Sequence, residues 1–176
     1  MGDALNQGGF GSCVSHALVT VIYDQLRHRY NVQILTKEII MSVIDAVDGF
    51  DGAHVEPAAE AITNKPVKFI NTGMDRLYQV KLDPGKRIND FDEFAALVRS
   101  SAGYCRAVVV VKTSRNSHGL HAIAAKGVSA GSFSSVECVN SWGDGGAGMR
   151  AAGSHRRSRV PVRLLFRRVH RRGAGV

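Results

Sequence analysis

The sequence predicts an α+β protein in which a helical lobe precedes a sheet lobe. Apolar residues recur at helical spacing in the first third of the chain, whereas short strand-like runs between turn residues dominate after Pro66. The chain has 176 residues, which suffices for one domain or for two small lobes that share an interface. We therefore expect a helical lobe over 1–65 and a sheet lobe over 66–150.

Helices are expected before Pro66, because apolar residues recur there every three to four positions. These predicted helices cover residues 13–29, 37–47 and 55–62. Ser12 and Thr36 can serve as N-caps of the first two. The third is expected to end before Pro66, because proline cannot continue a helix.

Strands and one further helix are expected beyond Pro66. β-branched and aromatic residues favour strands, and several runs of them are bounded by turn residues. The predicted strands cover residues 67–71, 78–82, 107–113, 121–128 and 134–142. An amphipathic helix with acidic residues in its first turn is expected over 90–101.

The net charge of +8 comes from the C-terminal end of the chain. Nine arginines and no acidic residue lie in 150–176, whereas residues 1–149 hold 14 basic residues against 15 acidic ones. A basic segment can bind nucleic acid or an anionic membrane surface. This one has no interleaved aromatic residue beyond Phe166 and no recognition motif, so we do not expect a nucleic-acid partner. We expect residues 151–176 to be a disordered or atypical tail.

The chain has three cysteines, an odd number, and no C-x-x-C pair: Cys13, Cys105 and Cys138. This argues against a disulfide framework and a zinc site, so we expect no metal and no cofactor. Cys105 and Cys138 are expected to be small core residues.

The N-terminus has no signal-peptide pattern, and no apolar run approaches the roughly 20 residues of a membrane span. We expect an intracellular monomer.

The stretch NQGGFGSC at 6–13 places a cysteine where a glycine-rich loop enters a helix. A thiol is a good nucleophile as its thiolate, which a helix N-terminus and a neighbouring imidazole stabilise. The imidazole in turn needs an orienting partner, and the oxyanion needs hydrogen-bond donors. His121 begins a predicted strand, Asn140 follows another, and Gln7 precedes Cys13 by six residues. These four residues can supply all the required groups.

The blocks NQGGFGSC, HAIAAKGV and NSWG, in this order, resemble those of the papain-like cysteine peptidases. The resemblance implies a papain-like two-lobed fold, with a helical lobe, an antiparallel β-barrel-like sheet lobe and the active site between them. It implies that Cys13 is the nucleophile, His121 the general base and acid, and Asn140 the residue that orients the imidazole. Gln7 and the Cys13 N–H then donate to the oxyanion, and Trp142 shields the His121–Asn140 hydrogen bond from water.

The resemblance also implies positions that contact the substrate. GFDGA at 49–53 is similar to the family's glycine loop, which pairs with the substrate backbone. The implied substrate-binding residues are Gly11, Ser12, Gly52, Ala53 and Trp142. The family's usual disulfide corresponds to the positions of Phe10 and Phe50, where an apolar contact can take its place.

Each site residue also has a purely structural interpretation. Cys13 can be a buried structural cysteine, His121 a core histidine on an apolar strand, and Asn140 a turn residue. Two further histidines compete for the role of base. His118 lies three residues before His121, and His16 lies one helical turn after Cys13, where its side chain should flank the helix.

The expected function is hydrolysis of peptide bonds through a thioester on Cys13, with a peptide or protein as substrate. Acyl transfer to an amine on the same residues is an open alternative. A second alternative is a catalytically silent relative that binds peptides or partners. This alternative rests on departures from the family pattern: Val14 replaces an aromatic residue, and the usual second tryptophan is missing after Gly143.

Overall fold

The structure is a computed structural model. It describes residues 5–30, 44–45, 52–64, 67–70, 77–82, 86–88, 90–99, 107–112, 120–129, 135–142, 150–152, 162–165 and 169–172. The predictions for Phe50, Cys105 and His118 lie outside these ranges. Most of the helix expected over 37–47 also lies outside them, although Ile44 and Asp45 are helical.

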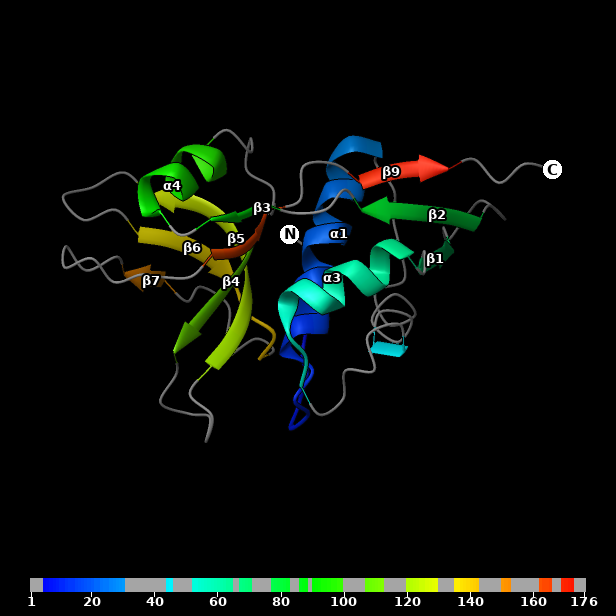
Figure 1. Cartoon of the computed structure of the whole chain (residues 1–176), viewed down its shortest axis with the longest axis horizontal. Helices are drawn as coiled ribbons and strands as arrows, with labels where there is room; N and C mark the ends of the chain where they lie inside the picture. The colour runs from blue at the N-terminus through cyan, green and yellow to red at the C-terminus, as the bar shows by residue number, and fades with distance from the viewer. Residues whose placement is uncertain are drawn as a thin grey trace.

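Helix α1, Cys13–Tyr30, lies at the centre of the fold (Figure 1). It begins directly after Ser12, whose carbonyl accepts a hydrogen bond from the His16 N–H at 3.1 Å. The predicted helix over 13–29 is therefore confirmed, as is its start. Every residue from Val14 to Val19 is buried, as are Val21, Ile22, Gln25 and Leu26. A helix that is buried on several sides belongs between layers of a core.

One side of α1 packs against a six-stranded sheet of order β3-β8-β4-β5-β6-β7. Its strands are Lys86–Ile88 (β3), Ala107–Lys112 (β4), Leu120–Ser129 (β5), Ser135–Val139 (β6), Arg150–Ala152 (β7) and Val162–Leu165 (β8). Each pairs with its neighbours in antiparallel fashion. Helix α4, Phe91–Arg99, packs against β5 and β3. The predicted strands at 107–113, 121–128 and 134–142 and the helix at 90–101 are thus confirmed within a few residues.

The central strands of this sheet are buried on both faces. Val108 and Val110 of β4 and Ala122 and Ala124 of β5 belong to one hydrophobic cluster with α1. The residues that alternate with them in the two strands point to the other face and are buried as well: Ala107, Val109, Ile123 and Ala125. This burial fixes the N-terminal end of β5, where His121 lies, against the core.

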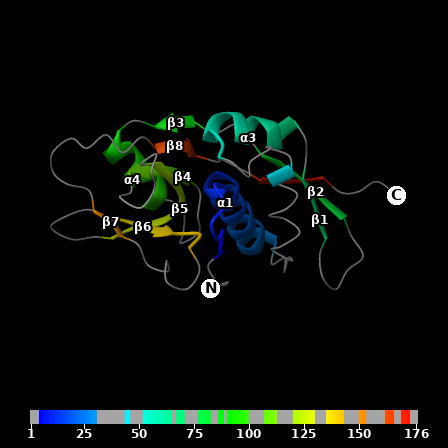
Figure 2. The ribbon, with the colours of Figure 1, turned by 90° about the horizontal axis from the view of Figure 1, so that it is seen from below.

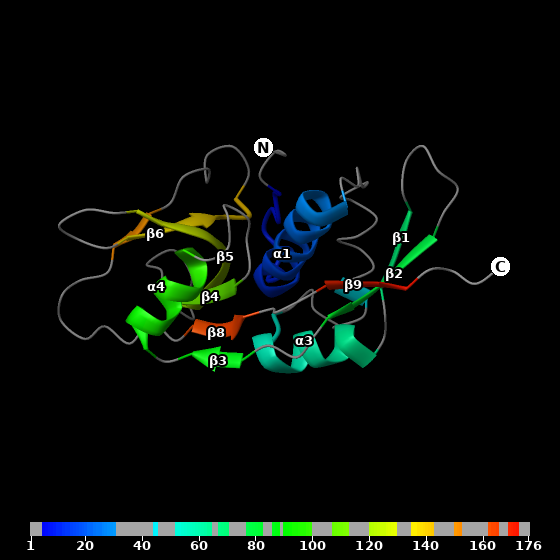
Figure 3. The ribbon, with the colours of Figure 1, turned by 90° about the horizontal axis from the view of Figure 1, so that it is seen from above.

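On the other side of α1 lies a three-stranded sheet of order β1-β2-β9 (Figures 2 and 3). Its strands are Val67–Ile70 (β1), Leu77–Leu82 (β2) and Val169–Arg172 (β9), and they pair antiparallel. Helix α3, Val55–Asn64, packs against both α1 and β2. The helix expected over 55–62 is therefore present and extends by two residues.

This arrangement differs from the predicted division of the chain at residue 66. β1 and β2, expected to open the sheet lobe over 66–150, pair in a separate sheet with β9. β8, from the predicted tail over 151–176, lies between β3 and β4. Strand pairing uses backbone groups, and the valines and leucines of VRLL and VHRR favour strands despite the arginines beside them. Two segments of the tail that was expected to be disordered or atypical are therefore strands, at 162–165 and 169–172.

Within the residues that the structure describes, no helix has both the length and the apolar character that crossing a membrane requires.

Candidate active site

The loop before α1 is closed by hydrogen bonds among its own residues. The side chain of Gln7 donates from Nε2 to the Phe10 carbonyl at 2.9 Å, and the Phe10 N–H donates back to the Gln7 carbonyl at 3.4 Å. Gly8 donates its N–H to Asn6 Oδ1 at 2.9 Å and has a φ of 61°. Only glycine adopts this left-handed conformation without cost from a Cβ atom. The closed loop leads the chain from Gln7 to Cys13, the first residue of α1.

This loop is attached to the segment that follows β6. Asn6 and Trp142 form an antiparallel bridge, and the Gln7 N–H donates to the Ser141 carbonyl at 2.8 Å. The Ser141 hydroxyl also forms a hydrogen bond with Gln7 Oε1. The two contacts between Gln7 and Ser141 join residues that are 134 positions apart in the chain. They place the predicted oxyanion donor beside the Asn-Ser-Trp segment.

The imidazole of His121 is held by Asn140. Its Nε2 lies 2.7 Å from Asn140 Oδ1, and the Ser141 N–H donates to the same oxygen at 2.8 Å. A backbone N–H can only donate, so the atom it meets on Asn140 must be the amide oxygen. His121 Nε2 must then carry a proton, which leaves Nδ1 as the basic nitrogen of the neutral ring.

His121 is almost completely buried, and its ring stacks on the indole of Trp142. Desolvation by burial lowers the pKa of His121 below 6.5, and the hydrogen bond to Asn140 partly opposes this by raising it. His121 Nδ1 is buried without a hydrogen-bond partner in the described part of the structure. Burial therefore favours the neutral form of the ring, in which Nδ1 is the basic nitrogen.

Cys13 is a free, half-buried cysteine in the first turn of α1. It packs against the hydrophobic cluster that includes Ala122, the residue after His121 in β5. As the first helical residue, it has an N–H with no acceptor inside the helix. Cys138, by contrast, is buried in β6, and desolvation raises the pKa of its thiol to about 12. Cys138 is thus the core residue that the sequence predicts, and an inert thiol at neutral pH.

The predicted substrate-binding residues differ in exposure. Gly11 and Gly52 are exposed, Ala53 and Trp142 are half-buried, and Ser12 is buried. Gly52 has a φ of 108°, a conformation that favours glycine. Ala53 packs against the central hydrophobic cluster.

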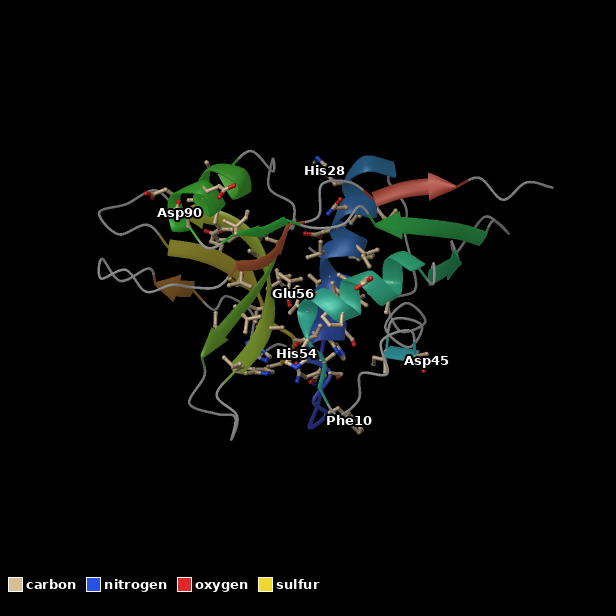
Figure 4. The ribbon with its side chains drawn as sticks, viewed as in Figure 1. Phe10, His28, Asp45, His54, Glu56 and Asp90 are labelled. Atoms are coloured by element: carbon tan, nitrogen blue, oxygen red, sulfur yellow. The ribbon has the colours of Figure 1, made fainter. Side chains whose placement is uncertain are left out.

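Phe10 lies at the tip of the loop, and its side chain points away from α1 (Figure 4). It is 63% exposed, so its ring is mostly in contact with solvent. The apolar contact expected between Phe10 and Phe50 stays a prediction, because Phe50 lies outside the described ranges.

His16, the competing histidine on α1, has a different environment. Its Nδ1–H donates to the Ser12 carbonyl at 2.9 Å, so the ring closes the first turn of its own helix. Burial lowers the pKa of His16 below 6.5, and the hydrogen bond to Ser12 acts in the opposite direction. Its ring nitrogen is therefore engaged by the backbone, whereas His121 Nδ1 is not.

The structure adds two features that the sequence did not predict. Gln7, expected to direct its amide toward the oxyanion, uses one Nε2–H to bind the Phe10 carbonyl, so one amide N–H is left. Ser141 contacts both Gln7 and Asn140, although no role for it was predicted. The available signal was its place between Asn140 and Trp142, two residues to which the resemblance already assigns roles.

The described residues contain no group of three or more His, Cys, Asp or Glu side chains that could hold a metal ion. No protein-family model matches the sequence, and no curated protein matches it either.

The fold is similar to those of several solved structures, among them a cysteine protease. A cysteine protease of Carica candamarcensis is 17% identical with a TM-score of 0.59, and the match covers 96% of this chain and 92% of that one. The bromelain protease of Ananas comosus, solved with an inhibitor, is 16% identical with a TM-score of 0.55, covering 93% and 90%. A recombinant stem bromelain precursor is 16% identical with a TM-score of 0.59, covering 98% and 67%. At this level of identity the similarity shows a shared fold.

Proposed function

We propose that this protein is a cysteine peptidase that hydrolyses peptide bonds with Cys13 as nucleophile and His121 as general base and acid. The observation that carries the proposal is the continuous set of hydrogen bonds from Gln7 through Ser141 and Asn140 to His121. It lies beside the helix that begins with Cys13, because α1 packs against β5. The cysteine proteases with the same fold are consistent with this function.

In the proposed acylation step, His121 Nδ1 takes the proton of the Cys13 thiol, and the sulfur attacks the carbonyl carbon of the substrate. As the carbon–sulfur bond forms, the carbonyl π electrons move to the oxygen. This oxyanion accepts hydrogen bonds from the Cys13 N–H and the remaining Nε2–H of Gln7. When the carbonyl re-forms, the carbon–nitrogen bond breaks, and the leaving nitrogen takes the proton from His121. The products of this step are an amine and a thioester on Cys13.

In the proposed deacylation step, a water molecule gives a proton to His121 Nδ1 and attacks the thioester carbon. The tetrahedral intermediate is stabilised by the same donors. Its collapse breaks the carbon–sulfur bond, and the sulfur of Cys13 regains the proton from His121. The products are a carboxylic acid and the free enzyme. An amine that takes the place of water gives acyl transfer by the same route.

Asn140 acts in this mechanism by fixing which nitrogen of His121 is basic. Its Oδ1 accepts from Nε2–H, so Nδ1 carries the lone pair in the neutral ring. Because burial lowers the pKa of His121 below 6.5, the ring is neutral at pH 7 and can accept a proton. The same hydrogen bond stabilises the imidazolium that forms transiently.

The proposal is tested by labelling with an epoxysuccinyl or vinyl-sulfone peptide probe, read by intact mass and peptide mapping. We expect one probe per wild-type chain on Cys13, none on Cys13→Ala, and strongly reduced labelling of His121→Ala. Cys138→Ala is the matched control, because its buried thiol has a pKa of about 12, and it should be labelled like wild type.

A folded wild-type chain that is not labelled at Cys13 would contradict the peptidase proposal and would favour a silent, peptide-binding relative. Circular dichroism of each variant establishes that it is folded. Incubation of a fluorogenic peptide with and without an added amine, followed by mass spectrometry, then distinguishes hydrolysis from acyl transfer.

A further inference from the structure

We propose that Ser141 is a positioning residue, which holds the oxyanion donor Gln7 and the imidazole orienter Asn140 in one fixed arrangement. This inference rests on the proposed peptidase function. Ser141 is 5% exposed and lies between the two residues that it joins. It does not itself contact the reacting atoms in the mechanism above, so its effect must pass through Gln7 and Asn140.

The direction of the hydrogen bond between Ser141 and Gln7 follows from the other end of the Gln7 amide. The Phe10 carbonyl can only accept, so the amide atom it meets must be the NH₂ group. The atom of Gln7 beside Ser141 is then the amide oxygen, which can only accept. The Ser141 hydroxyl therefore donates, and the Gln7 amide is held at both ends.

The backbone of Ser141 makes two further hydrogen bonds to the same two residues. Its N–H donates to Asn140 Oδ1 at 2.8 Å, and its carbonyl accepts from the Gln7 N–H at 2.8 Å. Ser141 thus binds Asn140 Oδ1, the oxygen that orients His121. It also binds both the backbone and the side chain of Gln7. A displacement of the loop that carries Gln7 would therefore also displace the segment that carries Asn140.

The hydroxyl is the only one of these groups that a side-chain substitution removes. Without it, Gln7 Oε1 loses its donor and the amide is held only by the Phe10 carbonyl, so the remaining Nε2–H is less firmly positioned. The oxyanion forms only after sulfur attack, so its donors stabilise the transition state more than the bound substrate. We therefore expect Ser141→Ala to lower kcat while KM changes little.

Two electrophiles separate this effect from a general loss of structure. Iodoacetamide alkylates the thiolate by displacing iodide at a saturated carbon, so no oxyanion forms. A peptide aldehyde adds the thiol to its carbonyl, and the resulting hemithioacetal oxygen occupies the oxyanion position. Ser141→Ala should weaken aldehyde binding by about 10-fold, the effect of one lost hydrogen bond to a developing charge, and change the alkylation rate by less than about twofold.

The matched variants are Ser141→Thr, which keeps the hydroxyl and should restore aldehyde binding, and Ser15→Ala. Ser15 is a buried serine of α1 whose hydroxyl has no hydrogen-bond partner among the described residues. Its removal should affect neither electrophile. Two results for Ser141→Ala would overturn the positioning role but not the peptidase proposal. One is an equal loss of aldehyde binding and of alkylation rate, and the other is aldehyde binding as tight as in wild type. A wild-type Cys13 alkylated no faster than a free thiol would instead contradict the peptidase proposal on which it rests.

Discussion

The imidazole of His121 stacks on the indole of Trp142, with ring centroids 4.6 Å apart and ring planes inclined by 26°. The indole is itself half-buried, so it covers one face of the imidazole against solvent. Burial is the largest cause of the lowered pKa of His121. The stacked indole therefore favours the neutral imidazole, in which Nδ1 carries no proton.

Substitution of Trp142 by alanine should raise the pKa of His121 toward 6.5, because water then reaches the ring and the charged form is less penalised. The acid limb of the pH–rate profile for Cys13 alkylation should move to higher pH. The kcat/KM for a peptide should fall by roughly 10-fold, since the His121–Asn140 hydrogen bond is exposed to competition from water. Trp142→Phe keeps an aromatic face and should behave more like wild type. An unchanged acid limb in the alanine variant would contradict this role for the indole.

Stability should decrease as the pH falls, in part because of His16. Burial lowers the pKa of His16 in the folded state below its value of 6.5 in the unfolded chain. The unfolded state therefore binds more protons in the range between the two pKa values. The stability that neutral His16 contributes is complete above 6.5 and is lost as the pH falls through the folded-state pKa.

His16→Gln removes this titration, so its free energy of unfolding should change less between about pH 7.5 and about pH 5 than that of wild type. Urea denaturation at both pH values measures the difference. His121 also has a lowered pKa, so the variant should keep part of the pH dependence. Identical pH dependence in the variant and wild type would show that His16 does not titrate differently on folding.

Gly8 and Gly9 form a matched pair in the loop before α1. A Cβ atom at either position meets no heavy atom within 4 Å, but only Gly8 has a positive φ, of 61°. Gly8→Ala should therefore lower the free energy of unfolding by about 1 kcal/mol through backbone strain, whereas Gly9→Ala should change it by less than about 0.5 kcal/mol. Urea denaturation of the two variants provides the comparison. Equal effects of the two substitutions would show that the left-handed turn is not required.

Gln25 is a buried glutamine of α1 with 0% exposure. Neither atom of its amide group has a hydrogen-bond partner in the described part of the chain. An unpaired buried amide carries a desolvation cost, so Gln25→Met, which has a similar shape, should stabilise the fold by about 1–3 kcal/mol. Gln25→Glu should destabilise it, because a carboxylate is costlier to bury than an amide. A methionine variant less stable than wild type in urea denaturation would indicate that the amide is in fact satisfied.

The amino-acid sequence determined the elements that depend on short-range patterns. Helix α1 was predicted with its first residue, because Val14, Leu18, Val21 and Ile22 recur at helical spacing and all four are buried. The runs of valine and alanine in β4 and β5 were predicted as strands for a similar reason. The sequence also indicates Gln7, Cys13, His121 and Asn140 as candidate site residues, because their types and order suit one chemistry.

Only the tertiary structure decided which strands pair and how the site residues are connected. β8 lies between β3 and β4, and β9 pairs with β2, although the high arginine content indicates a disordered or atypical tail. The protonated nitrogen of His121 and the link from Ser141 to Gln7 also required the structure. Strand pairing and these hydrogen bonds join residues far apart in the chain. Local propensity carries no information about such partners, because they are selected by the packing of the whole core.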